Sequence, residues 1–182
     1  MRNMRSGDPM NAATGLKLSE LRFAIVFLCI FFMLQYAYSA GRSGIIEHIV
    51  IDIVTVRPST AIINLIAPDT DAKASGHRIL STHGSLSILN GCEGTETMFL
   101  LLAAILAFKS SWLQKLKGAA LGVLIVYALN QARIVALFFT AQQNRKWFDL
   151  LHGYIAPTLI IVLSCLFFMW WASISHEQTD AT

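Results

Sequence analysis

Three side chains with the chemistry needed for acyl transfer lie in three separate parts of this 182-residue chain. A thiol-based transfer needs a nucleophile, a proton carrier and a cation that stabilises the oxyanion formed on the attacked carbonyl. Cys92 can supply the nucleophile, His152 the proton carrier and Arg133 the cation. The case for this chemistry depends on the elements that hold these residues, because spacing alone does not bring them together.

Cys92 lies in a Gly-rich turn, NGCEG (residues 90–94), directly before a hydrophobic segment. A helix N-terminus and a nearby cation both increase the thiolate fraction of a cysteine. The glycines of this turn permit a tight bend and close approach of a substrate backbone. Glu93 and Glu96 oppose thiolate formation if they face the thiol. A purely structural role for this lone cysteine is the alternative.

Arg133 and Asn130 lie three residues apart in the run YALNQARIVALFF, on one face of a predicted helix. An arginine inside a membrane span is costly and by default marks a functional site. Counted from Gly118, Arg133 lies about 22 Å along a hydrocarbon core about 30 Å thick, in its outer third. The alternative is an arginine that extends its charged end to the outer headgroups.

His152 lies in a polar loop before the last apolar run, and histidine exchanges protons near neutral pH. His48, His77 and His83 compete for the same role. A metal site made of His77, His83 and Cys92 matches no compact ligand spacing, and the chain has no CxxC or CxxH pair. We therefore predict no metal and no cofactor.

The composition indicates an integral membrane protein. The chain is 55% hydrophobic and only 14% charged, whereas an ordinary soluble domain carries about 25% charged residues. The net charge of +3 gives no indication of a nucleic-acid partner. Cys29 and Cys165 lie deep in apolar runs, where a cysteine behaves as a small hydrophobic residue.

We expect a single all-α membrane domain over residues 1–182, with about four transmembrane helices, the first of them uncleaved. Charges interrupt the apolar stretch 45–67, so we interpret it as helices at the interface or packed over the bundle, although a crossing there is the open alternative. Residues 69–75 read as a polar turn and residues 77–91 as a short β-hairpin that leads to the cysteine. The expected spans are 21–40, 95–108 (begun near Cys92), 118–140 and 154–172.

Basic residues orient these spans. The N-terminal tail (1–20) and the loop 109–117 carry many of them, so we place both in the cytoplasm together with the tail 173–182, which is polar and read as loose. Residues 41–94 and the polar loop 141–153 then face outward. The predicted location is a cytoplasmic membrane, with the site on the extracytoplasmic side.

Three stretches together resemble the exosortase/archaeosortase family over roughly residues 80–170: NGCEGTETMFLLLAA, NQARIVALFF and FDLLHGYIAP. Their order and spacing are fairly specific together, while each stretch is weak alone. The resemblance implies a membrane-embedded cysteine protease or transpeptidase whose catalytic residues correspond to Cys92, Arg133 and His152. The chain is shorter than eight-span exosortases and looks most like a compact form, exosortase H, which is paired with IPTL-type signals. Glu93 departs from the small polar residue expected after the cysteine.

The resemblance also implies the partners. Substrates are exported proteins with a C-terminal sorting signal made of a motif, a transmembrane helix and a basic cluster, cleaved at the outer face through a thioester. Membrane lipid is the other partner, and we expect the substrate to be bound or oriented by Asn130, Asn90, Gly91 and Glu93.

Two other classes of function stay open. A non-enzymatic membrane assembly or scaffold protein needs none of the three catalytic residues. A thiol oxidoreductase needs a second cysteine near Cys92, and neither Cys29 nor Cys165 is placed for that role.

Overall fold

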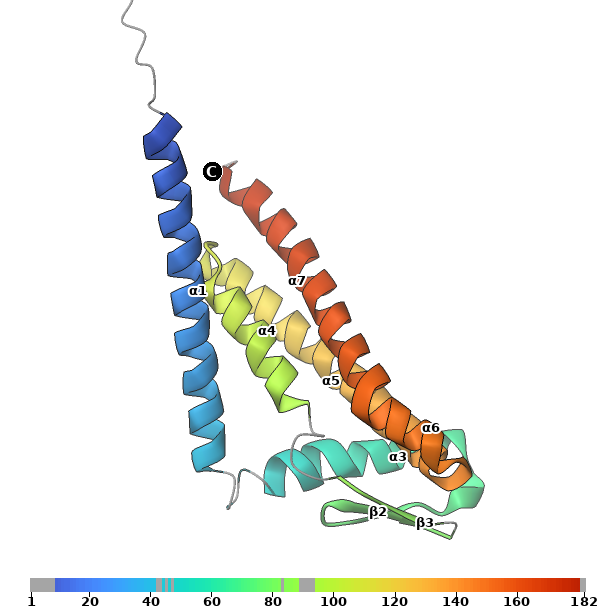
Figure 1. Cartoon of the computed structure of the whole chain (residues 1–182). Coiled ribbons are helices and arrows are strands. Elements are labelled where there is room, and N and C mark those ends of the chain that lie inside the picture. Colours follow the sequence, from blue (N-terminus) through green and yellow to red (C-terminus); the bar gives the residue numbers. More distant parts are fainter. Residues whose placement is uncertain are drawn as a thin grey trace, which may run out of the picture.

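The computed structural model describes residues 9–41, 44, 46, 48–82, 84–88 and 94–180, without the side chains of 9–17 and 176–180. Long helices dominate it, and a small sheet lies between η2 and α4 in the chain (Figure 1). The predicted all-α membrane fold is confirmed, and so is the short hairpin. The helical segments are α1 (Pro9–Ala40), the π-helix η1 (His48–Val56), α3 (Arg57–Ile66), the 3₁₀ turn η2 (Pro68–Thr70), α4 (Thr95–Ala107), α5 (Trp112–Gln143), α6 (Arg145–Leu150), the π-helix η3 (Leu151–Ile155) and α7 (Ala156–Asp180).

Four helical stretches are long and apolar enough to cross a membrane, judged by length and composition among the described residues. They are Leu18–Ala40, His48–Ile66, Trp112–Gln143 and Arg145–Ser175. This set differs from the expected one, because α4 has only 13 residues, or about 20 Å of helix. The stretch His48–Ile66 is longer than expected because η1 continues into α3 without a break, although Pro58 has no amide to donate to the Val54 carbonyl one turn earlier.

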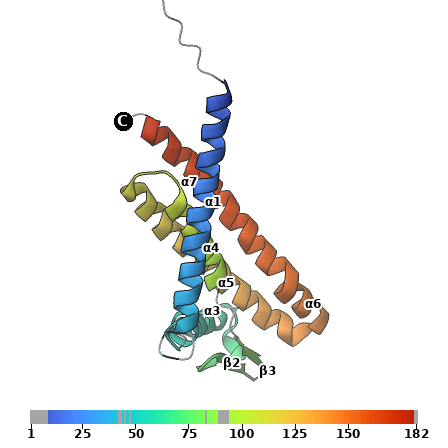
Figure 2. The same ribbon diagram turned by 60° about the vertical axis from the view of Figure 1, so that its left-hand side comes forward.

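The arrangement of the helices separates two ends of the molecule. In Figures 1 and 2, α1, α4, α5 and α7 run along one another, while α3 lies across one end beside the sheet. The start of α1, the turn between α4 and α5, and the end of α7 lie at the opposite end. Thus α3 has the transverse orientation expected of a layer packed over the bundle.

Three expectations about loops were wrong. The stretch 141–153 is helical apart from Asn144, whose side chain accepts a hydrogen bond from the Lys146 amide at 2.9 Å and so starts α6. The tail is helical as far as Asp180, because α7 continues without a breaking residue. Residues 69–75 hold η2 and the first strand rather than only a turn.

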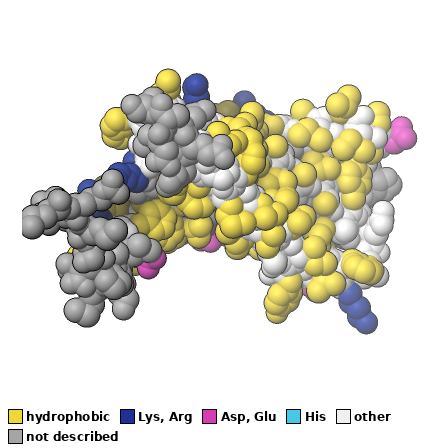
Figure 3. All heavy atoms as spheres, turned by 90° about the horizontal axis from the view of Figure 1, so that it is seen from above, with side chains coloured by type: hydrophobic (Ala, Val, Ile, Leu, Met, Phe, Trp, Pro, Cys, Tyr) yellow, Lys and Arg dark blue, Asp and Glu magenta, His cyan; other side chains and the backbone are white. Residues whose placement is uncertain are grey.

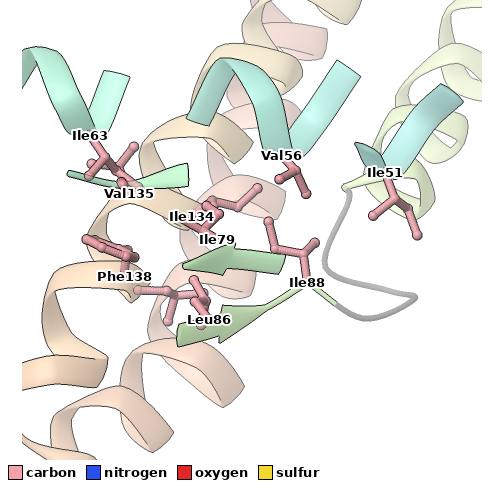
Figure 4. Close-up of a cluster of buried hydrophobic side chains, with 11 residues drawn as sticks. Ile51, Val56, Ile63, Ile79, Leu86, Ile88, Ile134, Val135 and Phe138 are labelled. Carbon is pink, nitrogen blue, oxygen red and sulfur yellow. The ribbon is translucent and has the colours of Figure 1, made fainter. Parts of the chain in front are cut away.

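The sheet is antiparallel with strand order β1 (Lys73–Ser75), β2 (Arg78–Ser81), β3 (Gly84–Ser87). One of its faces packs against η1, α3 and the last third of α5, where Ile79 pairs with Leu86 across the strands (Figure 4). This apolar cluster, which we call the outer core, joins the transverse layer formed by η1 and α3 to α5. Its buried members are Ile51, Val56, Ile63, Ala72, Ile79, Leu86, Ile88, Ile134, Val135, Leu137 and Phe138.

A second apolar cluster joins α4, α5 and α7 towards the other end, with Leu101, Val126 and Phe167 among its members. Elsewhere large apolar side chains cover much of the surface, as expected where lipid is the solvent (Figure 3). Exposed Trp112 begins α5 within the lysine-rich turn between α4 and α5 (Lys109, Lys115 and Lys117), and exposed Trp170 precedes Trp171, whose ring lies against Gly118 of α5. Tryptophans at this level are typical of an interfacial aromatic belt.

Two glycines set how closely α5 packs in this second cluster. A Cβ atom at Gly118 would overlap the indole ring of Trp171, and one at Gly122 would lie 2.9 Å from a Leu101 methyl. Small residues of this kind let helices pack closely inside a membrane, where there is no hydrophobic force between them. Gly118 and Gly122 therefore fix the position of α5 against α7 and α4.

We predict that Gly118→Ala destabilises the protein by about 1–3 kcal/mol, because the added methyl displaces a packed indole ring. The measurement is thermal unfolding of the purified chain in detergent. Gly44→Ala is the matched control, since its Cβ meets nothing closer than 3.8 Å. Equal melting temperatures for the two variants would contradict this packing role.

Candidate functional site

Asn130 and Arg133 lie on one face of α5, close to the end that carries the sheet. A capping box starts this helix: the Ser111 hydroxyl accepts from the Gln114 amide, and the Gln114 side chain accepts from the Ser111 amide. Asn130 is only 2% exposed and Arg133 is half-buried. An amide and a guanidinium are thus held inside the protein at one level of the bundle.

Gly94 brings the start of α4 against Asn130. Its φ of 77° is in the left-handed region, and a Cβ there would lie 2.9 Å from Asn130 Cγ and 3.0 Å from Asn130 Oδ1. Only glycine satisfies both the backbone conformation and the close approach. The first residues of α4 are therefore held against the face of α5 that carries Arg133.

His152 contacts Arg133 through its backbone. Arg133 Nη2 donates a hydrogen bond of 3.4 Å to the backbone carbonyl of His152. The ring of Phe148 stacks on the His152 imidazole, with ring centroids 5.5 Å apart and planes 3° from parallel. Arg133 and Asp149 are the charged groups that act on this imidazole. Helical geometry from α6 into η3 aligns Phe148 and His152, since residues four apart share a helix face.

Buried polar atoms without a partner gather among these residues. The described part of the chain has five such side-chain atoms, and three of them are Asn130 Oδ1, Arg133 Nε and His152 Nδ1. Native proteins satisfy nearly all their buried polar groups, so exceptions call for an explanation such as a catalytic role. Asn130, Arg133 and His152 are the residues that sequence reasoning had selected, and the structure brings them together.

Four predicted site residues, Asn90, Gly91, Cys92 and Glu93, lie outside the described residues. Of the flanking groups, Glu96 is described: it lies in the first turn of α4 and is exposed to solvent. The competing His48 is likewise exposed and forms a pair with Asp52 on η1, while His83 is outside the described residues. Among described residues, no group of three or more His, Cys, Asp or Glu side chains is placed to hold a metal ion.

A polar anchor beside the site was missed in the sequence. The Gln131 side chain accepts a hydrogen bond from the Ser59 hydroxyl of α3 and donates one of 3.2 Å to the carbonyl of Val54 in η1. The Tyr127 hydroxyl donates to that same carbonyl at 2.9 Å. The signal was present, because a glutamine four residues after a tyrosine in an apolar span is costly unless both side chains find partners.

We predict that Gly94→Ala destabilises the protein by about 1–3 kcal/mol through left-handed strain and overlap with Asn130. Asn130→Ala in the same chain removes the two closest atoms and should recover part of that loss. The measurement is a double-mutant cycle of unfolding free energies in detergent. Strictly additive effects would show that the two side chains do not meet.

The comparison with protein families gives one result for this chain. The model for the transmembrane exosortase (Exosortase_EpsH) matches residues 13–171, which include α4, α5 and the whole of the site described above. The comparisons with curated proteins and with solved structures give no match. The match spans most of the chain, and the predicted family resemblance is confirmed: this multi-pass membrane protein belongs to the transmembrane exosortase family.

Proposed function

We propose that this protein is a membrane-embedded cysteine protease or transpeptidase that cleaves C-terminal sorting signals of exported proteins. The observation that carries the proposal is the group of three unpartnered buried polar atoms on Asn130, Arg133 and His152. Family membership supports an enzyme of the exosortase type. The oxidoreductase and scaffold alternatives gain no support from any described contact.

Chain connectivity supports a position of Cys92 close to these groups. It precedes Gly94 by two positions, so their Cα atoms are at most about 7 Å apart. Gly94 in turn touches Asn130, three positions before Arg133 on the same helix. In the proposed site the Cys92 thiol faces the Arg133 guanidinium and the N-terminus of α4, and both favour the thiolate form of a cysteine. Glu96 opposes that effect weakly, because solvent screens its exposed carboxylate.

In the proposed reaction each residue has one kind of role. The Cys92 thiolate attacks the scissile carbonyl carbon, and a tetrahedral oxyanion forms. Arg133 stabilises this oxyanion, with Asn130 orienting the substrate or the guanidinium. The leaving amine takes a proton from His152 as the C–N bond breaks, which leaves a thioester on Cys92. Water or an acceptor amine then attacks the thioester, returns a proton to His152 and releases the product.

A tripartite signal suits this architecture. The substrate's own transmembrane helix packs laterally against the exposed apolar faces of the bundle and brings its motif to the end that carries the sheet. We assign that end to the extracytoplasmic side of the bacterial inner membrane. The lysine-rich turn between α4 and α5 lies at the other end and is then cytoplasmic, in keeping with the positive-inside rule.

We predict that substitution of each catalytic residue abolishes processing of a reporter that ends in an Ile-Pro-Thr-Leu motif, a transmembrane helix and a basic cluster. Cys92→Ala and Cys92→Ser should lose roughly a thousandfold or more in rate. Arg133→Ala and His152→Ala should each lose about a hundredfold or more. The measurement is the ratio of processed to unprocessed reporter in cells that express each variant at equal level.

The controls for this experiment are Cys29→Ala and Cys165→Ala, which remove the exposed cysteines of α1 and α7 and should process normally. Normal maturation by Cys92→Ala would refute the protease and leave the scaffold as the better explanation. Loss of activity in Cys165→Ala together with Cys92→Ala would instead favour a redox pair.

We predict that the two ends of the molecule react differently with a membrane-impermeant maleimide. In a chain stripped of its native cysteines, Ser85→Cys on β3 should be labelled in spheroplasts, whereas Lys109→Cys should be labelled only after lysis. The measurement is the mass shift of the purified chain. The reverse pattern would place the proposed site in the cytoplasm and exclude exported substrates.

A further inference from the structure

The hydrogen-bond register of the sheet shows which backbone groups face its outer edges. The Ile88 amide donates to the His77 carbonyl at 2.8 Å, so these residues form a hydrogen-bonded pair. Hydrogen-bonded and non-hydrogen-bonded pairs alternate along an antiparallel ladder. The pairs of Ser87 with Arg78 and of Ser85 with Leu80 are then the non-bonded ones. The amide and carbonyl groups of Ser85 and Ser87 consequently point away from β2, off the outer edge of β3.

At the opposite edge of the sheet, a side chain pairs with the residue that directly precedes β1. Asn64 of α3 donates from Nδ2 to the Ala72 carbonyl and accepts from the Ala72 amide at Oδ1, both at 2.9 Å. A side-chain amide that pairs with both groups of one residue substitutes for a neighbouring strand. Edge strands are a liability that proteins cover or block, and here the β1 edge is blocked at Ala72.

The β3 edge carries no such block in the described part of the chain. Gly84, Ser85 and Ser87 are all exposed, while Leu86 and Ile88 are buried against the outer core. One side of the strand is thus fixed to the protein and its edge is left open to solvent. Small side chains at both outward positions leave the backbone accessible, since Ser85 and Ser87 present only a hydroxymethyl group each.

We propose that the outer edge of β3 binds the extended motif of the substrate's sorting signal by adding it to the sheet as a fourth strand. This inference rests on the proposed protease function, because its occupant is that enzyme's substrate. Strand addition gives affinity through main-chain hydrogen bonds and leaves side-chain pockets to provide specificity. Ser85 and Ser87 supply the outward donors and acceptors.

The position of β3 in the chain supports this occupant. Cys92 is five positions after Ser87, a span of at most about 17 Å. A peptide bound along the strand therefore lies within a few residues of the nucleophile. A protease also needs its substrate extended, because a helical segment holds its backbone groups in internal hydrogen bonds.

The first experiment removes the outward donors. Ser85→Pro and Ser87→Pro delete amides that do not pair with β2, so the ladder stays intact. Each should reduce processing of the Ile-Pro-Thr-Leu reporter about tenfold, as expected for one lost hydrogen bond that leaves its partner unsatisfied. Ala74→Pro is the matched control on the opposite edge and should stay within about twofold of the wild-type rate. Equal rates for all three variants would overturn the proposal.

The second experiment detects binding without catalysis. In a Cys92→Ser chain that also lacks Cys29 and Cys165, Ser85→Cys and Ser87→Cys are oxidised with reporters carrying one cysteine at successive motif positions. Adducts should form at alternate positions, because side chains alternate along a strand. Ala74→Cys should give none. No adduct at any position, or equal adducts from Ala74→Cys, would overturn the proposal.

The two experiments separate this inference from the function on which it rests. If the reporter forms alternate adducts but wild-type protein never cleaves it, strand addition stands and the protease fails. If wild-type protein cleaves the reporter but no adduct forms and Ser85→Pro and Ser87→Pro retain full rates, the protease stands and strand addition fails.

Discussion

The buried side chain of Gln131 is the constraint on which the site end of this protein depends. An amide inside an apolar helix is costly unless both its donor and its acceptor find partners, and a lost partner leaves a deficit of about 1–3 kcal/mol. Among the described residues, Gln131 obtains them from Ser59 and from the Val54 carbonyl, which belong to α3 and η1. The layer formed by η1 and α3 therefore has one position relative to α5 in which the Gln131 side chain finds both of these hydrogen-bond partners. The outer core then closes around that position, with Ile134 and Phe138 one and two turns further along α5.

The π-helical form of η1 explains how one carbonyl serves two side chains. Wider winding moves backbone hydrogen bonds out of their usual i to i−4 register, and such segments occur often near functional sites. Here the Val54 carbonyl receives both Tyr127 and Gln131, and the Thr55 hydroxyl turns back to Val50 at 2.7 Å. Local distortion of one helix thus supplies the acceptor that holds a second helix in place.

The polar side chains next to this anchor differ from it, because some of their buried atoms have no hydrogen-bond partner. Asn130, one position before Gln131, leaves its oxygen without a partner, and so do the Arg133 Nε and the His152 Nδ1. The Gln131 side chain has hydrogen-bond partners, whereas polar atoms of Asn130 and Arg133 beside it have none. One short stretch of α5 thus holds both an anchor and a site. Such a division is expected where binding groups must be rigidly placed yet free to meet a substrate. Gly94 completes the arrangement, because a larger residue would separate the start of α4 from Asn130.

The sequence by itself determined the membrane class and the hairpin, and it singled out the residues of the candidate site. Long apolar runs, and the free-energy cost of burying Arg133 within one of them, depend only on residues near each other in the chain, so they can be recognised from the sequence. It also indicated the family, through three short stretches in a fixed order. It did not determine where helices end, because Asn144 interrupts a polar stretch that otherwise stays helical into α7.

Only the tertiary structure decided which groups meet. Contact between Gly94 and Asn130, the hydrogen bond from Arg133 to the His152 carbonyl, and the partners of Gln131 all join residues far apart in the chain. The transverse placement of α3 was likewise decided by burial against α5 and the sheet rather than by the hydropathy of its own residues. Sequence periodicity reports what one segment prefers, whereas these contacts depend on how several segments satisfy one another's buried polar atoms.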